Sequence, residues 1–71
     1  MKHKPENEAG ERAALEQTLA TRPEALAAWS ALPPSRQAEW LRYVAEAARP
    51  QTRERRRAKV LEAMLARACE A

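Results

Sequence analysis

The sequence predicts an all-α protein, a compact bundle of about four short helices. Alanine, the residue with the highest helix propensity, accounts for 17 of the 71 residues. The β-branched and aromatic residues that favour strands are scarce, since the chain has no Ile, no Phe and two Val. Prolines interrupt the amphipathic segments, and they set the expected helices at 11–20, 23–31, 34–48 and 50–68.

A chain of this length allows one small domain with a thin hydrophobic core. Residues 1–10, "MKHKPENEAG", are polar and lack apolar periodicity, so we expect them to form a disordered tail. Residues 11–71 are expected to form a single helical domain. The turns between its helices are short, which should pack sequential helices against each other.

Large apolar residues recur at helical spacing in every expected helix. Leucines lie one turn apart in 11–20, and a leucine and a tryptophan share one face of 23–31. Apolar stripes at spacings of three and four follow in 34–48 and in the second half of 50–68. The residues expected in the core are Leu15, Leu19, Leu26, Trp29, Leu32, Trp40, Leu41, Val44, Val60, Leu61, Met64 and Leu65.

The positive charge is concentrated in one stretch. The chain carries a net charge of +3, and residues 49–59 contain six basic side chains and one glutamate. With about 100° per residue, Arg53 and Arg57 fall inside the apolar arc of the last helix, and Arg56 falls at its edge. Arg55 and Lys59 point to solvent, so the basic residues do not share one face.

An arginine that points toward neighbouring helices must find a partner or extend along their surface. Glu39 and Glu46 on the preceding helix are candidate partners, as is a backbone carbonyl at a helix end. A guanidinium stacked over Trp29, Trp40 or Tyr43 is a further alternative.

The segment "ALPPSRQAEWLRYVAEAARPQTRERRRAKVLEAML" resembles the helical C-terminal domain of the bacterial YdeI/OmpD-associated (bacteriocin-protection) family. Thr52, Arg53 and Arg56 match the family's Thr-Arg-x-x-Arg motif, which follows a matching aromatic helix. Ala48 stands where that family usually has lysine, and Arg57 where it usually has isoleucine or leucine. The resemblance implies a helical fold and a link to bacteriocin protection or a porin, and it carries no catalytic residues.

The composition argues against an enzyme. The chain has no Asp, one His and one Cys, so we expect no catalytic residues, no metal site and no cofactor. The single cysteine, Cys69, cannot form an internal disulfide, and no apolar run is long enough for a transmembrane segment. A cytoplasmic location is therefore expected.

We interpret the chain as a structural or protein-interaction module of unknown partner, with self-association left open. In this reading Thr52 caps or buttresses the last helix, Arg53 reaches carboxylates or carbonyls, and Arg56 lies at the edge. The alternative is a nucleic-acid-binding protein that uses the basic start of the last helix. The basic interaction patch would then comprise Arg49, Arg55, Arg56 and Lys59. Adsorption to anionic lipid is a weaker alternative.

Overall fold

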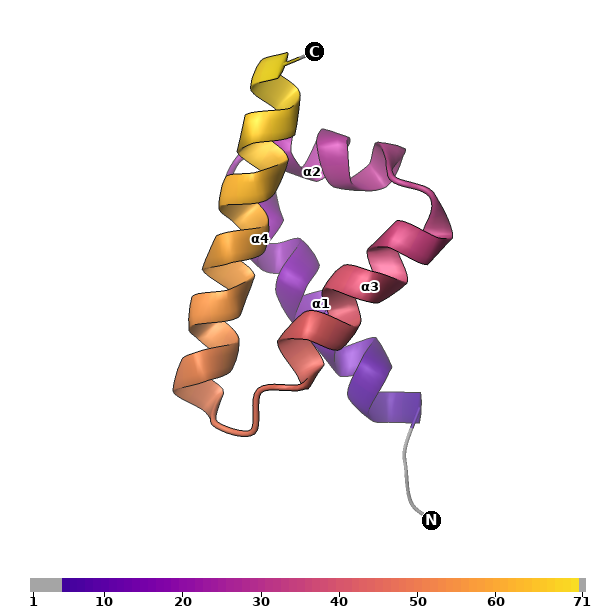
Figure 1. The fold of residues 1–71 in the computed structure, drawn as a ribbon, viewed down its shortest axis with the longest axis vertical. Coiled ribbons are helices and arrows are strands. Elements are labelled where there is room, and N and C mark those ends of the chain that lie inside the picture. Colours follow the sequence, from indigo (N-terminus) through magenta and orange to yellow (C-terminus); the bar gives the residue numbers. More distant parts are fainter. Residues whose placement is uncertain (1–4, 71) are drawn as a thin grey trace.

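A computed structural model describes the backbone of residues 5–70 and the side chains of residues 10–69. The described backbone forms four helices, shown in Figure 1. They are α1 (Pro5–Ala20), α2 (Pro23–Ala31), α3 (Pro34–Ala45) and α4 (Pro50–Glu70). The predicted all-α class is confirmed. Each helix begins at a proline, a residue that suits the first turn because its missing N–H is not needed there.

Three helix boundaries differ from the prediction. α1 begins at Pro5 and not at residue 11, while residues 1–4 of the predicted tail lie outside the described part of the chain. α3 ends at Ala45, so the predicted end at residue 48 is wrong. The Ala47 N–H donates to the Val44 carbonyl at 3.2 Å, a tighter turn that closes the helix early. α4 continues past residue 68 to Glu70.

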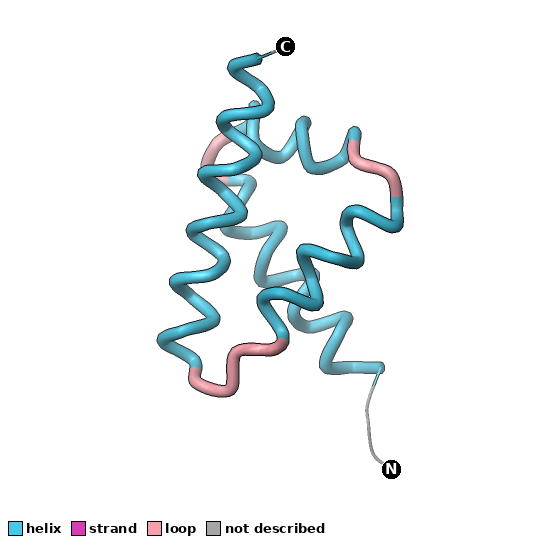
Figure 2. The backbone as a smooth tube through the Cα atoms, viewed as in Figure 1, coloured by secondary structure: helices cyan, strands magenta, loops and turns pink. Residues whose placement is uncertain are grey.

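The connections between the helices are short, as Figure 2 shows, and span residues 21–22, 32–33 and 46–49. At the first connection, Arg22 precedes α2 and its side chain donates to the Glu24 carboxylate at 3.0 Å. A backbone hydrogen bond, assisted by Arg22, lowers the pKa of Glu24 below its ordinary value. At the second, Gln37 Nε2 donates to the Trp29 carbonyl at 2.8 Å and ties α3 to the end of α2.

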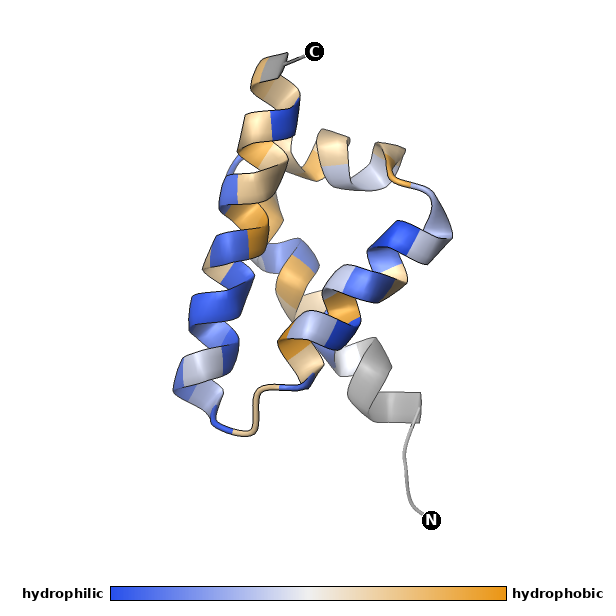
Figure 3. Cartoon of the chain, in the orientation of Figure 1, coloured by the Kyte–Doolittle hydropathy of each residue, from blue (hydrophilic) through white to orange (hydrophobic). Residues whose placement is uncertain are grey.

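The two ends of α4 pack against different neighbours. α4 makes its most extensive contact with α2, and α1 passes behind α3 and touches all three other helices (Figure 1). In Figure 3 the first half of α4 is mostly hydrophilic, whereas its second half is mostly apolar. The apolar half therefore supplies core residues, and the basic half must dock by other contacts.

The core lies where α1, α2, α3 and α4 meet. Trp29 is its largest member and is 1% exposed. Its indole N–H has no hydrogen-bond acceptor among the described residues, which costs about 1–3 kcal/mol and is offset by the large apolar area it buries. Ala25 and Ala47, which the predicted core omitted, are buried because their small side chains let the chain approach closely. The other buried hydrophobic residues are Leu15, Leu19, Leu32, Leu41, Val44, Val60 and Met64.

Several residues of the predicted core are only partly covered. They pack against the buried cluster from its rim, and part of each side chain stays in contact with solvent. These residues are Leu26, Trp40, Leu61 and Leu65. Across residues 5–70, none of the helices combines the length and the apolar character that crossing a membrane requires.

Gly10 offers a test of how α1 is stabilised. It lies inside α1 with an ordinary helical backbone, and a Cβ added there would meet nothing within 4 Å. Gly10→Ala should therefore raise the free energy of unfolding by about 0.5–1 kcal/mol, because alanine loses less backbone entropy in a helix. Thermal denaturation followed by circular dichroism measures this. The exposed Ala13→Gly in the same helix should lower stability by a similar amount, and an unchanged or lower Tm for Gly10→Ala would contradict the continuous α1.

Candidate functional site

The turn from α3 to α4 leaves backbone carbonyls without their usual partners. A helix ends with carbonyls that have no intrahelical donor. Here the Glu46 N–H donates to the Arg42 carbonyl at 2.9 Å, and the Ala47 N–H donates to Val44. The Tyr43 carbonyl thus loses the Ala47 donor that a continuing helix would supply. The Ala47 carbonyl lies beyond the helix, in the connection.

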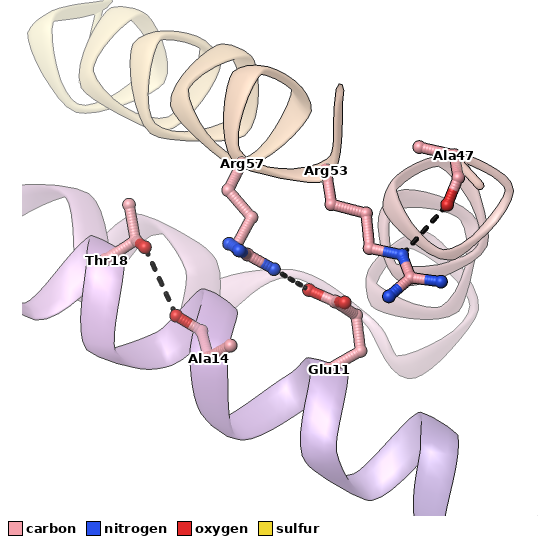
Figure 4. A network of polar contacts seen from close by, with 6 residues as sticks. All are labelled: Glu11, Ala14, Thr18, Ala47, Arg53 and Arg57. Carbon is pink, nitrogen blue, oxygen red and sulfur yellow. Dashed lines mark hydrogen bonds and ion pairs between the residues drawn. The ribbon is translucent and has the colours of Figure 1, made fainter. Parts of the chain in front are cut away.

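Arginines of α4 donate to both of these carbonyls. Arg53 Nε donates to the Ala47 carbonyl at 2.8 Å, as Figure 4 shows. Arg56 Nη1 donates to the Tyr43 carbonyl at 2.7 Å, and its guanidinium carbon lies 4.8 Å from the centre of the Tyr43 ring. Both arginines are half-buried. Of the partners considered for the inward-pointing arginines, Arg53 takes a backbone carbonyl. Arg56, which was expected at the edge, takes a backbone carbonyl and the Tyr43 ring.

The same contacts explain why arginines occupy the start of α4. A cation in the first turns of a helix opposes the positive end of the helix dipole, at a cost of about 0.3–1 kcal/mol. Because the turn is short, these guanidinium groups also lie at the C-terminal, negative end of α3, where cations are favourable. Both arginines therefore stabilise the end of α3, and Arg53, in the first turns of α4, does so while it opposes the start of that helix.

Arg57 forms an ion pair with a residue far away in the sequence. Its Nη1 lies 2.7 Å from Glu11 Oε2 of α1, as Figure 4 shows. The two side chains are 18% and 10% exposed. The inward orientation of Arg57 agrees with its predicted position inside the apolar arc of the helix. Its partner differs from the carboxylates considered from the sequence, which were Glu39 and Glu46. Neither pairs with an α4 arginine among the described side chains, and Glu39 instead faces Arg36 at 3.9 Å.

Thr52 does not cap α4. The helix starts at Pro50, and the Arg49 carbonyl accepts from the Arg53 N–H at 3.0 Å, which leaves Thr52 inside the first turn. Thr52 is half-buried there. Thr52 is therefore not the N-cap residue, the alternative that it buttresses the helix start stays a prediction, and the motif's polar contacts come from Arg53 and Arg56.

The buried face of α4 is rotated relative to the prediction. At about 100° per residue Ala58 falls inside the apolar arc of the helix, but it is exposed, whereas Ala63 falls outside the arc and packs against the core. Arg56, expected at the edge of the arc, is half-buried, which agrees with that position. The rotation follows from α3, which covers the side of α4 that carries Arg56 and Ala63. The angular positions of residues around a single helix do not show which neighbouring helix will cover it.

The structure divides the predicted basic patch. Arg49, Arg55 and Lys59 are exposed, and Arg56 is held by Tyr43. The fourth member of the patch is thus engaged in the contact between α3 and α4, and the other three stay in solvent.

A cleft lies between the first half of α3 and the second half of α4, away from the turn that connects the two helices. We call it the α3–α4 cleft, and its volume is about 440 Å³. Trp40 lines it and packs edge-on against Tyr43, with ring centres 5.8 Å apart. Sequence reasoning missed this site, because its residues come from two helices and a turn whose juxtaposition no local pattern encodes. The lining residues are Leu32, Pro33, Arg36, Trp40, Ala63, Met64 and Arg67.

The contact between Arg53 and Ala47 predicts a ranking of variants. Arg53→Ala should lower the free energy of unfolding by about 1.5–3 kcal/mol, because it removes a charge-assisted hydrogen bond and leaves a carbonyl without a donor. Arg55→Ala, at an exposed position of the same helix, should change it by less than about 0.5 kcal/mol. Chemical denaturation of both variants measures the difference. Equal losses would contradict the structural role of Arg53.

The ion pair between Arg57 and Glu11 predicts strong coupling. Arg57→Leu alone leaves a poorly exposed carboxylate without its cation, and it should destabilise the fold by roughly 1–3 kcal/mol. The double variant Glu11→Leu/Arg57→Leu should recover most of this loss, since an apolar pair of similar volume often replaces a buried ion pair without cost. The pair of Arg12 and Glu16, with exposures of 46% and 44%, is the control and should show coupling below about 0.5 kcal/mol. Additive losses at Glu11 and Arg57 would contradict the pairing.

Comparison with known proteins identifies the family of this chain. A model of the family described as bacteriocin-protection, YdeI or OmpD-associated matches residues 12–67. The match includes the arginine contacts to Tyr43 and Ala47 and every residue of the α3–α4 cleft, whereas Glu11 lies just outside it. Searches of curated proteins and of solved structures found no match. With this match over most of its length, the chain belongs to the bacteriocin-protection, YdeI or OmpD-associated family.

Proposed function

We propose that this protein is a non-catalytic protein-interaction domain whose binding surface is the α3–α4 cleft. The observation that carries the proposal is the position of Trp40. This tryptophan lines an open cleft and remains partly exposed, with Arg36 and Arg67 also at the cleft. Tryptophan and arginine are the residues that most often dominate the binding energy of protein interfaces.

The shape of the cleft supports this role. Its floor includes buried core residues such as Leu32 and Met64, which are held in place by the packing of four helices. A rigid floor lowers the entropy lost on binding. The edge-on packing of Trp40 on Tyr43, which itself contacts Arg56, orients the exposed ring in the same way.

The sequence favours a role without catalysis. It contains no Asp, a single His and a single Cys, so the Ser-His and Cys-His pairs of nucleophilic catalysis have few candidate members. Ser30 and Ser35 are exposed near the ends of helices, a common position for serine in turns and caps.

Nucleic-acid binding is disfavoured as the main role, because the fold uses much of the basic stretch internally. Arg53 and Arg56 donate to carbonyls, and Arg57 pairs with Glu11. Affinity for duplex nucleic acid grows with the number of phosphates that cations neutralise. Three exposed cations of the predicted patch, Arg49, Arg55 and Lys59, would supply only a few such contacts.

The family description suggests the setting of the interaction. It names bacteriocin protection and association with OmpD, which favours a partner connected to the cell envelope. The absence of an apolar stretch long enough for a transmembrane helix in residues 5–70 is compatible with a protein that acts from the cytoplasm. A second copy of the chain remains an alternative partner.

The proposal is tested by recovering partners with and without Trp40. Tagged wild-type protein is purified from its native cells after chemical cross-linking, beside Trp40→Ala and the control Arg55→Ala/Lys59→Ala. We expect Trp40→Ala to lose most of a co-purifying protein that the control retains, because the cleft and not the basic surface holds it. Ala63→Gln, which fills the cleft, should have the same effect if both variants keep their helical spectrum at the growth temperature. Equal recovery with all variants, or loss in the control alone, would contradict the proposal.

A further inference from the structure

We infer that the α3–α4 cleft recognises an acidic, apolar segment of its partner protein. A large apolar side chain packs on Trp40, and neighbouring carboxylates lie beside Arg36 and Arg67. This inference rests on the proposed function and adds the chemistry of the partner.

The apolar half of the recognition comes from the floor of the cleft. Leu32, Met64 and Ala63 form it, and Trp40 forms one wall. A volume of about 440 Å³ lies within the range of about 300–1,000 Å³ that is typical of ligand pockets. Such a cleft holds one or two large apolar side chains and is too small for a whole helix. The partner therefore inserts an anchor residue and does not bury a long surface here.

The charged half comes from the rim. Arg36 lies in the first turn of α3 and Arg67 in the last turn of α4, and both are exposed. No carboxylate lines the cleft among the side chains that the structure places. Arg36 faces Glu39 at 3.9 Å, but both side chains are largely in water, so this contact neutralises it weakly. The N-terminal end of the α3 dipole adds to the positive field at Arg36.

A second depression lies beside the α3–α4 cleft. It has a volume of about 370 Å³ and is lined by Glu24, Ala27, Ala28, Ala31, Arg67 and Ala68. Arg67 belongs to both depressions, so they meet at that residue. The alanines allow a passing chain to approach α2 closely. The carboxylate of this second depression, Glu24, already pairs with Arg22 at 3.0 Å, so it opposes an acidic partner only weakly.

The experiment uses phage-displayed random dodecapeptides as the probe and the full chain as bait. The peptides that are enriched on wild-type protein should carry a large apolar residue flanked by Asp or Glu. Isothermal titration calorimetry should show at least about tenfold weaker binding to Arg36→Glu/Arg67→Glu, because two attractive contacts become repulsive. The matched control Arg55→Glu/Lys59→Glu has the same change in net charge away from the cleft, and it should bind within about twofold of wild type.

The tryptophan signals report where a peptide binds. In ¹⁵N-labelled protein, the selected peptide should shift the indole resonance of the partly exposed Trp40 and leave that of the buried Trp29 unchanged. No enriched peptide, peptides without acidic residues, or equal binding to the two charge-reversed variants would overturn the inference. A cellular partner that depends on Trp40 but is insensitive to Arg36→Glu/Arg67→Glu would overturn the acidic chemistry alone. Loss of the Trp40 dependence itself would remove the proposed function as well.

Discussion

The arrangement of this small domain depends on how the C-terminal end of α3 is satisfied. The chain leaves α3 in a tight turn that strands the Tyr43 and Ala47 carbonyls. Arginines from the next helix reach back to both. These contacts hold the start of α4 against the end of α3, while α4 makes its most extensive contact with α2. The α3–α4 cleft lies between the same two helices, farther from their connecting turn. The arginine contacts near the turn between α3 and α4 thereby help to shape the α3–α4 cleft farther along the same two helices.

Such contacts matter because the core is thin. A domain of this size buries a smaller fraction of its surface than a larger domain does, and its core supplies little net stability. The two halves of α4 are held by different contacts. The second half packs its apolar residues on α2, and the first half makes polar contacts with α3 and α1. The basic composition of the stretch 49–59 is therefore explained largely by the fold. A cluster of arginines in a sequence does not require an anionic ligand when a helix end lies within reach.

The helical class, the proline starts and most of the apolar core could be predicted from local pattern, because propensity and periodicity are encoded residue by residue. The helical periodicity of residues 50–68 also predicted that Arg53 and Arg57 point inward. It could not identify Glu11 as a partner, since that contact spans 46 positions and depends on how α1 crosses the bundle. The rotation of α4 toward α3 and the meeting of Trp40 with Arg67 were beyond prediction for the same reason. The sequence of a helix predicts which of its faces is apolar, but it does not predict which other helix packs on that face.

The pairing of Arg57 with Glu11 also bears on where the folding unit begins. The two side chains of this pair are poorly exposed, and the family match starts one residue after Glu11. This chain has thus placed a charge in a sheltered position and supplied its counterion from outside the matched segment. A fragment trimmed to the matched residues would keep the cation and discard the carboxylate. The folded domain must therefore include Glu11, so its N-terminal boundary lies upstream of residue 12, where the family match begins.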